Sequence, residues 1–360
     1  MRKQDRAPLN YLWLYHVLFA LFYTQFLKGD ANYYYETALQ MDASQFRTYL
    51  SQGLGTHFIF GFNYIFAHLL KMNYIITTLS YALMGYVGIV CFYIVTVRCI
   101  PQNSKLGRLN LFPFLFFLPN LHIWSCAVGK DSLSFMCIGL FAYGMLAWRK
   151  RMFLLLFALF FAYCIRPHIT FFLIASFGFV LTFSESLTKK QRIVIVMFLV
   201  IGGLLLLPKV MSYAQIEDTS LASFQNFSNS RISNLSRSHT GSRIDISNYP
   251  LPLKMVTFLY RPLFFDITSI PGLLASIENA LLLFLSIRVL KQKPKGVYKN
   301  APVIVQGLLV FLFLGTLAFS NMLSNLGIML RMRNMFLPCL ILYVLWSNSY
   351  YNQHSQKEQP

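Results

Sequence analysis

Apolar runs long enough to cross a lipid bilayer recur along most of this 360-residue chain. A transmembrane helix needs about 20 predominantly apolar residues to cross a hydrocarbon core of ~30 Å. Such runs, some of them short, lie near residues 9–27, 73–97, 110–128, 132–148, 152–165, 168–184, 193–210, 267–288, 301–320 and 334–347. The sequence therefore predicts an all-α, polytopic membrane bundle of about ten transmembrane helices. We expect a single transmembrane domain over residues 1–360.

The composition excludes an ordinary soluble globule, because 56% of the residues are hydrophobic and only 12% are charged. The formal net charge of +19 would also suit a nucleic-acid-binding protein. The Lys and Arg residues lie between the apolar runs, however, so they indicate membrane topology and no nucleic-acid partner. The six cysteines lack CxxC and Cys/His spacing, and we expect free thiols without a disulfide framework or metal site.

Basic clusters in the short connections predict the orientation of the bundle, because short basic loops stay in the cytoplasm. The clusters are Arg2/Lys3/Arg6, Arg98/Lys105/Arg108, Arg149/Lys150/Arg151, Lys189/Lys190/Arg192 and Arg288/Lys291/Lys293/Lys295/Lys299. One assignment places all of them inside, with both termini cytoplasmic. The first apolar run stays in place as a span, because it is too long for a signal peptide and no small-x-small cleavage site follows it.

This topology leaves two substantial loops outside, at residues 28–72 and 211–265. The first contains a Tyr-rich candidate helix near 33–50 and a short apolar run at 56–70. We interpret both as interfacial or re-entrant helices, because counting 56–70 as a span would invert every later loop. The alternative is an ordinary span in a chain with an unusual topology. The second loop is polar and rich in Ser and Asn.

Ionisable clusters at the edges of the apolar runs gather on this outer side. Such groups at membrane depth cost several kcal/mol unless they are paired or face a wet cavity, so they mark a functional site by default. The clusters are Gly29-Asp30, Gly129-Lys130-Asp131, Arg166-Pro167-His168, Arg261-Pro262 and Arg331-Met332-Arg333.

Each cluster also has a purely structural interpretation. Asp30 would cap the helix that follows it, and Lys130 and Asp131 would neutralise each other. Arg166 would snorkel at a helix end before Pro167. Two Arg-Pro turns on one side, at Arg166 and Arg261, are harder to explain in this way.

The outer loops also carry cations that the positive-inside rule would deplete: Lys209, Arg231, Arg237, His239, Arg243 and Lys254. A pyrophosphate accounts for them, because guanidinium groups bind phosphate oxygens bidentately. The alternative is that outer loops of moderate length escape the rule. Two Asn-x-Ser sequons, at Asn226 and Asn234, are weak evidence of glycosylation. Nucleotide-driven pumps, metalloproteases and serine hydrolases lack their defining motifs here.

The layout and three local phrases resemble known membrane enzymes. A first span ending in an Asp within a long outer loop, with a second long outer loop between the seventh and eighth spans, resembles the GT-C membrane glycosyltransferases. The segments 117–132 (FLPNLHIWSCAVGKDS), 163–168 (YCIRPH) and 331–338 (RMRNMFLP) look like those of Wzy-type and related polymerases of bacterial O-antigen and capsule loci. The resemblance covers most of the chain as a layout with short phrases and contains no specific motif.

This resemblance implies glycosyl transfer from polyprenyl-(pyro)phosphate-linked sugars on the outer face of the bacterial inner membrane. By position, Asp30 corresponds to the family's catalytic base or metal ligand, which makes a divalent metal the one candidate cofactor. Glu36 and Asp42 lie near it as candidates for the family's second acidic residue. The lipid phosphates would be bound by Lys130, Arg166, His168, Arg261, Arg331 and Arg333, with Glu36, Arg237 and Arg243 as acceptor or loop contacts.

Two rival functions come from other classes. A flippase or exporter of lipid-linked glycan would also need cations to bind the pyrophosphate, and these should extend along the spans to line a path. The spans here are nearly free of charge between their ends. A non-catalytic component of a polysaccharide synthase complex would tolerate changes at the clusters. The expected partners are therefore a lipid-linked sugar, the bilayer and polysaccharide-assembly proteins.

Overall fold

The computed structural model describes residues 3–27, 29–184, 187–214, 242–246, 248–267, 269–292 and 296–357. Most of these residues are helical, and the only strands among them are β1 (Lys105–Leu106) and β2 (Leu109–Asn110), which form a short antiparallel hairpin. The expected all-α class is confirmed. The chain folds as two compact units, Met1–Cys99 with Lys105–Thr170 and Ile100–Ser104 with Phe171–Pro360.

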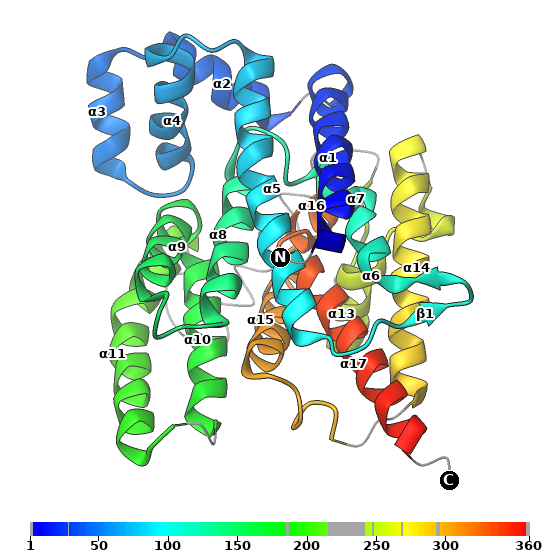
Figure 1. The fold of residues 1–360 in the computed structure, drawn as a ribbon. Coiled ribbons are helices and arrows are strands. Elements are labelled where there is room, and N and C mark those ends of the chain that lie inside the picture. The colour runs from blue at the N-terminus through cyan, green and yellow to red at the C-terminus, as the bar shows by residue number, and fades with distance from the viewer. Residues whose placement is uncertain are drawn as a thin grey trace. The chain divides into compact units, whose positions relative to one another are not determined.

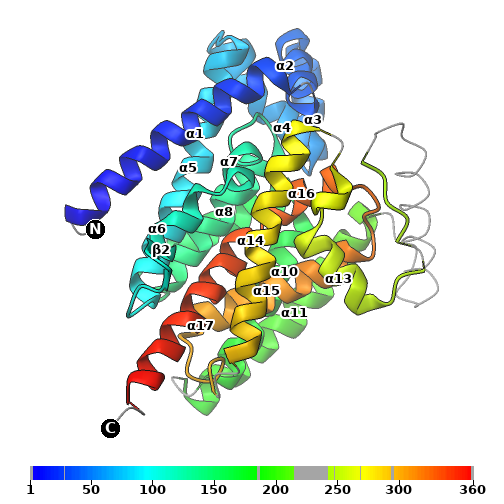
Figure 2. The ribbon, with the colours of Figure 1, turned by 90° about the vertical axis from the view of Figure 1, so that its right-hand side faces the viewer.

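Long helices form the body of the first unit. They are α1 (Arg6–Phe26), α5 (Tyr74–Cys99), α8 (Lys130–Met145) and α9 (Met152–Ile165). α1 and α5 run side by side (Figure 2). The Tyr86 hydroxyl of α5 donates a hydrogen bond to the Leu9 carbonyl of α1. α9 ends at the residue before Pro167, because proline disfavours a helical conformation in the residue that precedes it. α10 (Pro167–Phe183) then begins at that proline.

Glycines allow the helices of the first unit to pack closely. A Cβ added at Gly139 of α8 would lie 2.8 Å from the Cα of Gly88 in α5, and one at Gly85 would lie 1.7 Å from the Ser125 carbonyl oxygen. Real Cβ atoms do not approach so closely, so the helix backbones themselves are in contact. Contacts between small residues are the usual means by which helices associate in membranes. Figure 1 shows α5 and α8 alongside each other.

The first of the two loops predicted to lie outside contains three helices, α2 (Asp30–Gln40), α3 (Ala43–Gln52) and α4 (Thr56–Tyr64). The helix expected near 33–50 is thus two helices, because Asp42 caps α3 through a capping box with Gln45. α4 continues into a π-helical turn, η2 (Ile65–Leu69). At 1.5 Å per residue α4 and η2 together measure about 21 Å, which is short of a hydrocarbon core of ~30 Å.

One expected span is wrong as a single helix. Residues 110–128 form three short pieces, α6 (Leu111–Phe114), η3 (Leu115–Phe117) and α7 (Pro119–Ile123). Pro113 and Pro119 lack the backbone N–H that a continuous helix needs. The segment is apolar because it is buried in protein: Leu115, Phe116 and Leu121 are at most 1% exposed.

The second unit contains helices from the C-terminal half of the chain. These are α11 (Lys189–Ala214), α13 (Leu251–Tyr260), α14 (Ile270–Gln292), α15 (Val303–Ser320), α16 (Leu326–Arg333) and α17 (Leu337–Lys357), with the 3-10 turn η4 (Phe264–Asp266). The last expected span, 334–347, belongs to a pair, α16 and α17, whose axes differ by 64°.

Within the described residues, three helices are long and apolar enough to cross a membrane: α5, α14 and α15. Counting the bent pair α16 and α17 as one span makes up to four. α9, α10 and α13 are apolar but shorter. These long apolar helices are compatible with a membrane protein, and they are fewer than the ten spans expected from the sequence.

We expect Gly139→Ala to destabilise the first unit by about 1–3 kcal/mol, because the added methyl group would push α5 and α8 apart. The measurement is thermal unfolding of the purified protein in detergent. Gly202→Ala is the matched control, since a Cβ at Gly202 meets nothing within 4 Å. Equal unfolding temperatures for Gly139→Ala and the wild type would contradict the backbone contact.

Candidate functional site

The start of α8 brings Lys130 to the helices of the first outer loop. Gly129 has φ +144°, and a Cβ there would lie 3.2 Å from a ring carbon of Tyr34 in α2. Only glycine fits this turn, because an L side chain would be strained and would crowd the ring. The Nζ atom of the next residue, Lys130, donates a 2.7 Å hydrogen bond to the Thr56 hydroxyl at the start of α4.

Asp131 and Arg166 form a buried ion pair one residue further along. The Arg166 Nη2 atom lies 2.5 Å from Asp131 Oδ1, and the two side chains are 5% and 11% exposed. Arg166 is the last residue before Pro167, so the pair joins the start of α8 to the break between α9 and α10. His168 follows in the first turn of α10, with its Nε2 atom buried.

We call Lys130, Asp131, Arg166 and His168 the helix-end cluster. Its residues lie at the N-terminal ends of α8 and α10, where unsatisfied backbone N–H groups and the helix dipole favour anions. The cluster contains two cations and one carboxylate, so it carries a formal charge of +1 with His168 neutral. This charge and these donors suit a phosphate group.

Asp30 is the first residue of α2 and is exposed. Gly29 occupies the N-cap position, so Asp30 lies in the first turn of α2 and is not its N-cap residue. Tyr34, which packs against Gly129, is one helical turn away and on the same face as Asp30. Asp30 is therefore an accessible carboxylate on the helix that contacts the start of α8.

The two other acidic residues of the loop differ from each other. Glu36 is exposed on α2. Asp42 caps α3: its Oδ1 atom accepts hydrogen bonds of 2.7 Å from the Gln45 N–H and the Ser44 hydroxyl. These hydrogen bonds, that of the Gln45 N–H first, lower the pKa of the Asp42 carboxyl. Asp42 thus has a structural role at the start of α3.

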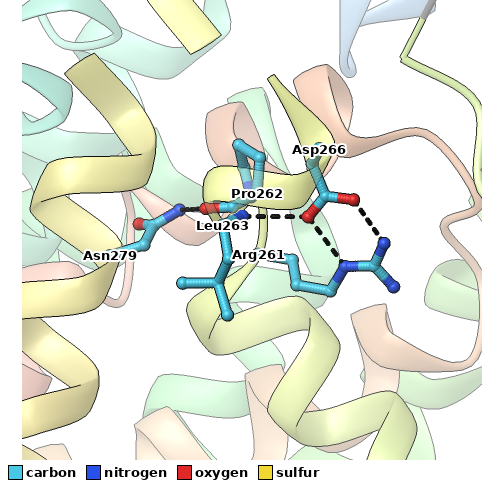
Figure 3. A network of polar contacts seen from close by, with 5 residues as sticks. All are labelled: Arg261, Pro262, Leu263, Asp266 and Asn279. Atoms are coloured by element: carbon cyan, nitrogen blue, oxygen red, sulfur yellow. Dashed lines mark hydrogen bonds and ion pairs between the residues drawn. The ribbon is translucent and has the colours of Figure 1, made fainter. Parts of the chain in front are cut away.

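A second group of the predicted residues lies in the second unit, at the turn after α13. Arg261 donates to both carboxylate oxygens of Asp266, with Nε 2.9 Å from Oδ2, and the Leu263 N–H donates to Asp266 at 2.9 Å (Figure 3). The peptide bond between Arg261 and Pro262 is cis. Asn279 of α14 donates to the Pro262 carbonyl at 2.8 Å. Arg261 is 18% exposed and stays at the surface of this turn.

Arg333 is held inside the second unit. Its residue is 1% exposed, and its Nη1 and Nη2 atoms donate 2.6 Å hydrogen bonds to the Leu259 carbonyl and to Asn279 Oδ1. The buried carboxylate of Glu278 interacts with it electrostatically. Arg333 therefore joins α13, α14 and α16. Arg331, two residues earlier, is half-buried.

Several polar residues of these sites escaped the sequence analysis. Glu278 and Asn279 lie within the apolar run 267–288, and an ionisable residue inside such a run was the signal that could have revealed them. His16 and His122 also pair in the first unit, with their Nδ1 atoms 3.0 Å apart and both rings fully buried. Both histidines lie within apolar runs as well.

The remaining predicted residues belong to the large polar loop. Arg243 forms an isolated antiparallel bridge with Asn325 and is exposed. Arg231, Arg237, His239 and both sequons lie outside the described residues. In the part of the chain that the structure describes, no three His, Cys, Asp or Glu side chains are placed to hold a metal ion. All six cysteines are free thiols.

No protein-family model, no curated protein and no solved structure matches this chain.

We expect Asp131→Asn to destabilise the protein by about 3–5 kcal/mol, because it removes the negative charge next to a buried guanidinium. The double variant Asp131→Asn/Arg166→Met should recover much of this loss, since it removes the buried positive charge as well. Thermal unfolding of Asp131→Asn, Arg166→Met and the double variant measures these losses of stability. If the double variant loses as much stability as the two single variants together, the ion pair is not the cause.

We expect the folded protein to lose the stabilisation contributed by Asp266 in acid. Burial raises the pKa of its carboxyl, but hydrogen bonds from Arg261 and the Leu263 N–H lower it more, so the pKa lies below its ordinary value. The stabilisation is present above the unfolded-state pKa of about 3.9 and is lost as the pH falls through the folded-state pKa. Unfolding measured from pH 7 down to pH 2 should show a wild-type advantage over Asp266→Asn that is constant above about pH 4 and shrinks below it. An advantage independent of pH would contradict the pairing.

Proposed function

We propose that this protein is a membrane glycosyltransferase that uses polyprenyl-(pyro)phosphate-linked sugars in the biosynthesis of a bacterial cell-surface polysaccharide. The observation that carries the proposal is the helix-end cluster beside the helix that begins with Asp30. A cationic cluster at helix N-termini suits the phosphate of a lipid carrier, and an accessible carboxylate suits the activation of a sugar hydroxyl.

In this proposal Lys130, Arg166 and His168 bind the phosphate of the donor lipid. A guanidinium has five N–H donors in a fixed plane, and the ion pair with Asp131 holds the orientation of that plane. The excess positive charge stabilises the phosphate as it leaves the sugar. In the second unit, Arg261 and Arg331 remain candidates for phosphate binding in this proposal, and the buried Arg333 acts on Arg261 through the backbone of its turn.

The reaction itself transfers a glycosyl group to a hydroxyl. The acceptor oxygen forms a bond to the anomeric carbon, and the bond from that carbon to the phosphate oxygen breaks. The electron pair of the broken bond leaves with the polyprenyl (pyro)phosphate, and the hydroxyl proton goes to the Asp30 carboxylate. This arrangement makes Asp30 the general base.

The proposed location is the outer face of the inner membrane, in a bundle of about ten spans with both termini in the cytoplasm. The basic short loops support this orientation through the positive-inside rule. The 14 residues of α4 and η2 support an interfacial position for the first outer loop, because a helix of that length does not reach across the hydrocarbon core.

A flippase for the same lipid-linked glycan is the second candidate. The observation in its favour is the set of buried polar residues inside apolar helices, namely His16 in α1 and Glu278 and Asn279 in α14. A transport path through the bilayer needs polar groups at such positions.

The experiment uses purified full-length protein in proteoliposomes with a lipid-linked oligosaccharide. Glycosyl transfer gives a longer lipid-linked product, flipping moves the donor between leaflets without lengthening it, and a scaffold does neither. A lengthened product is the expected result. Movement without lengthening, or neither change, would overturn the proposal.

We expect Asp30→Asn to lower the rate of product formation by about 10²–10⁴-fold, which is the usual contribution of a general base. Asp42→Asn is the matched control, since it removes a carboxylate from the same loop and asparagine caps a helix as well as aspartate. Equal rates for Asp30→Asn and the wild type would remove Asp30 from the mechanism.

A further inference from the structure

A cavity lies along the hairpin of α10 and α11. Its volume is ≈ 400 Å³, and its lining includes Phe171, Phe179 and Phe183 of α10 and Leu199, Gly202 and Gly203 of α11. Thr182 also lines it, but its hydroxyl donates to the Gly178 carbonyl at 2.8 Å. The walls are therefore almost entirely apolar. We call this space the hairpin cavity.

Two glycines of α11 keep the cavity open. A Cβ at Gly202 or Gly203 would meet nothing within 4 Å, whereas one at Gly178 of α10 would lie 2.2 Å from the Leu199 side chain. Gly178 thus serves the close packing of the two helices, and Gly202 and Gly203 leave space that the protein does not fill. α10 and α11 lie side by side in Figure 1 and Figure 2.

Three basic residues lie at the end of the hairpin that connects α10 to α11. Lys189, Lys190 and Arg192 occupy the first turn of α11, and Glu185 is the one acidic residue in the sequence from 184 to 192, which leaves a formal charge of +2. Lys189 and Lys190 are exposed. The Nε atom of Arg192 is buried and makes no hydrogen bond to any described residue.

Arg192 lies on the same stripe of α11 as the cavity wall. Leu199 and Gly203 follow it by seven and eleven residues, which places each of them within about 20° of Arg192 around the helix axis. Gly203 is about 16 Å from Arg192 along that axis. One leaflet of a ~30 Å hydrocarbon core has about the same depth, ~15 Å. The cavity therefore extends one leaflet deep from a cationic surface.

We propose that the hairpin cavity binds an acyl chain of an anionic phospholipid, whose phosphate is bound by Lys189, Lys190 and Arg192. The apolar walls take up the chain, and the cations distinguish an anionic from a zwitterionic headgroup. The positive-inside rule places this end of the hairpin in the cytoplasm, where a basic surface meets anionic lipids. This lipid site is separate from the donor site proposed above and does not depend on glycosyl transfer.

The test measures lipid binding to the purified full-length protein by native mass spectrometry. The probes are phosphatidylglycerol and phosphatidylcholine with identical acyl chains. We expect the wild type to bind phosphatidylglycerol at least about fivefold more tightly, since one cation near a membrane surface contributes about 1 kcal/mol. Arg192→Gln should weaken phosphatidylglycerol binding by about fivefold and leave phosphatidylcholine binding unchanged.

Gly203→Leu should weaken the binding of both lipids, because its side chain fills the space that the acyl chain occupies. Two controls match these variants: Lys291→Gln removes an exposed cation from the last turn of α14, and Leu204→Phe adds bulk on the exposed side of α11. Both controls should bind the lipids as the wild type does. Unchanged thermal unfolding of each variant shows that the fold is retained.

Three results would overturn the proposal. The first is that the wild type binds both lipids equally. The second is that Arg192→Gln and Gly203→Leu bind them as the wild type does. The third is that a polyprenyl phosphate displaces phosphatidylglycerol from the wild type at equal concentration, which would assign the cavity to an isoprenoid chain.

Discussion

The buried ion pair between Asp131 and Arg166 joins three helix ends of the first unit. Arg166 is the C-cap residue of α9 and directly precedes the proline that starts α10, while Asp131 is in the first turn of α8. The pair therefore fixes three helix ends at one place. A buried charge without a partner would be strongly destabilising, so neither residue can be replaced alone without cost. The position of Lys130 beside Thr56 follows from this arrangement, because Lys130 precedes Asp131 in the chain.

Much of the helical structure could be predicted from apolar runs and prolines. The helices α5, α9 and α10 follow the runs at 73–97, 152–165 and 168–184, and Pro167 separates the last two as expected. The run at 110–128 was misinterpreted, since a segment buried in protein is as apolar as one that faces lipid. The bend between α16 and α17 could not be predicted either, because the local sequence does not show which elements these two helices pack against.

The sequence identified residues of the candidate site, but it did not reveal which of them contact one another. Lys130, Asp131, Arg166 and His168 stood out as ionisable residues beside apolar runs, and the structure brings them together in the first unit. The partner of Asp131 lies 35 residues away, and those of Arg333 lie 54 and 74 residues away. Such distant contacts leave no trace in a single sequence. The role of Asp42 as a cap, by contrast, is local and could have been recognised from Gln45 three residues later.

The contacts of Arg333 also restrict how the second unit can move. The Arg333 guanidinium of α16 donates hydrogen bonds to the Leu259 carbonyl of α13 and to the Asn279 side chain of α14. Asn279 in turn donates to the Pro262 carbonyl. Separating any two of these helices would break hydrogen bonds to a buried cation, which are among the costliest to lose. We therefore expect α13, α14 and α16 to shift as one rigid body in any conformational change. The hairpin of α10 and α11 has no part in these hydrogen bonds and packs instead through close contacts, such as that of Gly307 in α15 with the Phe177 ring in α10.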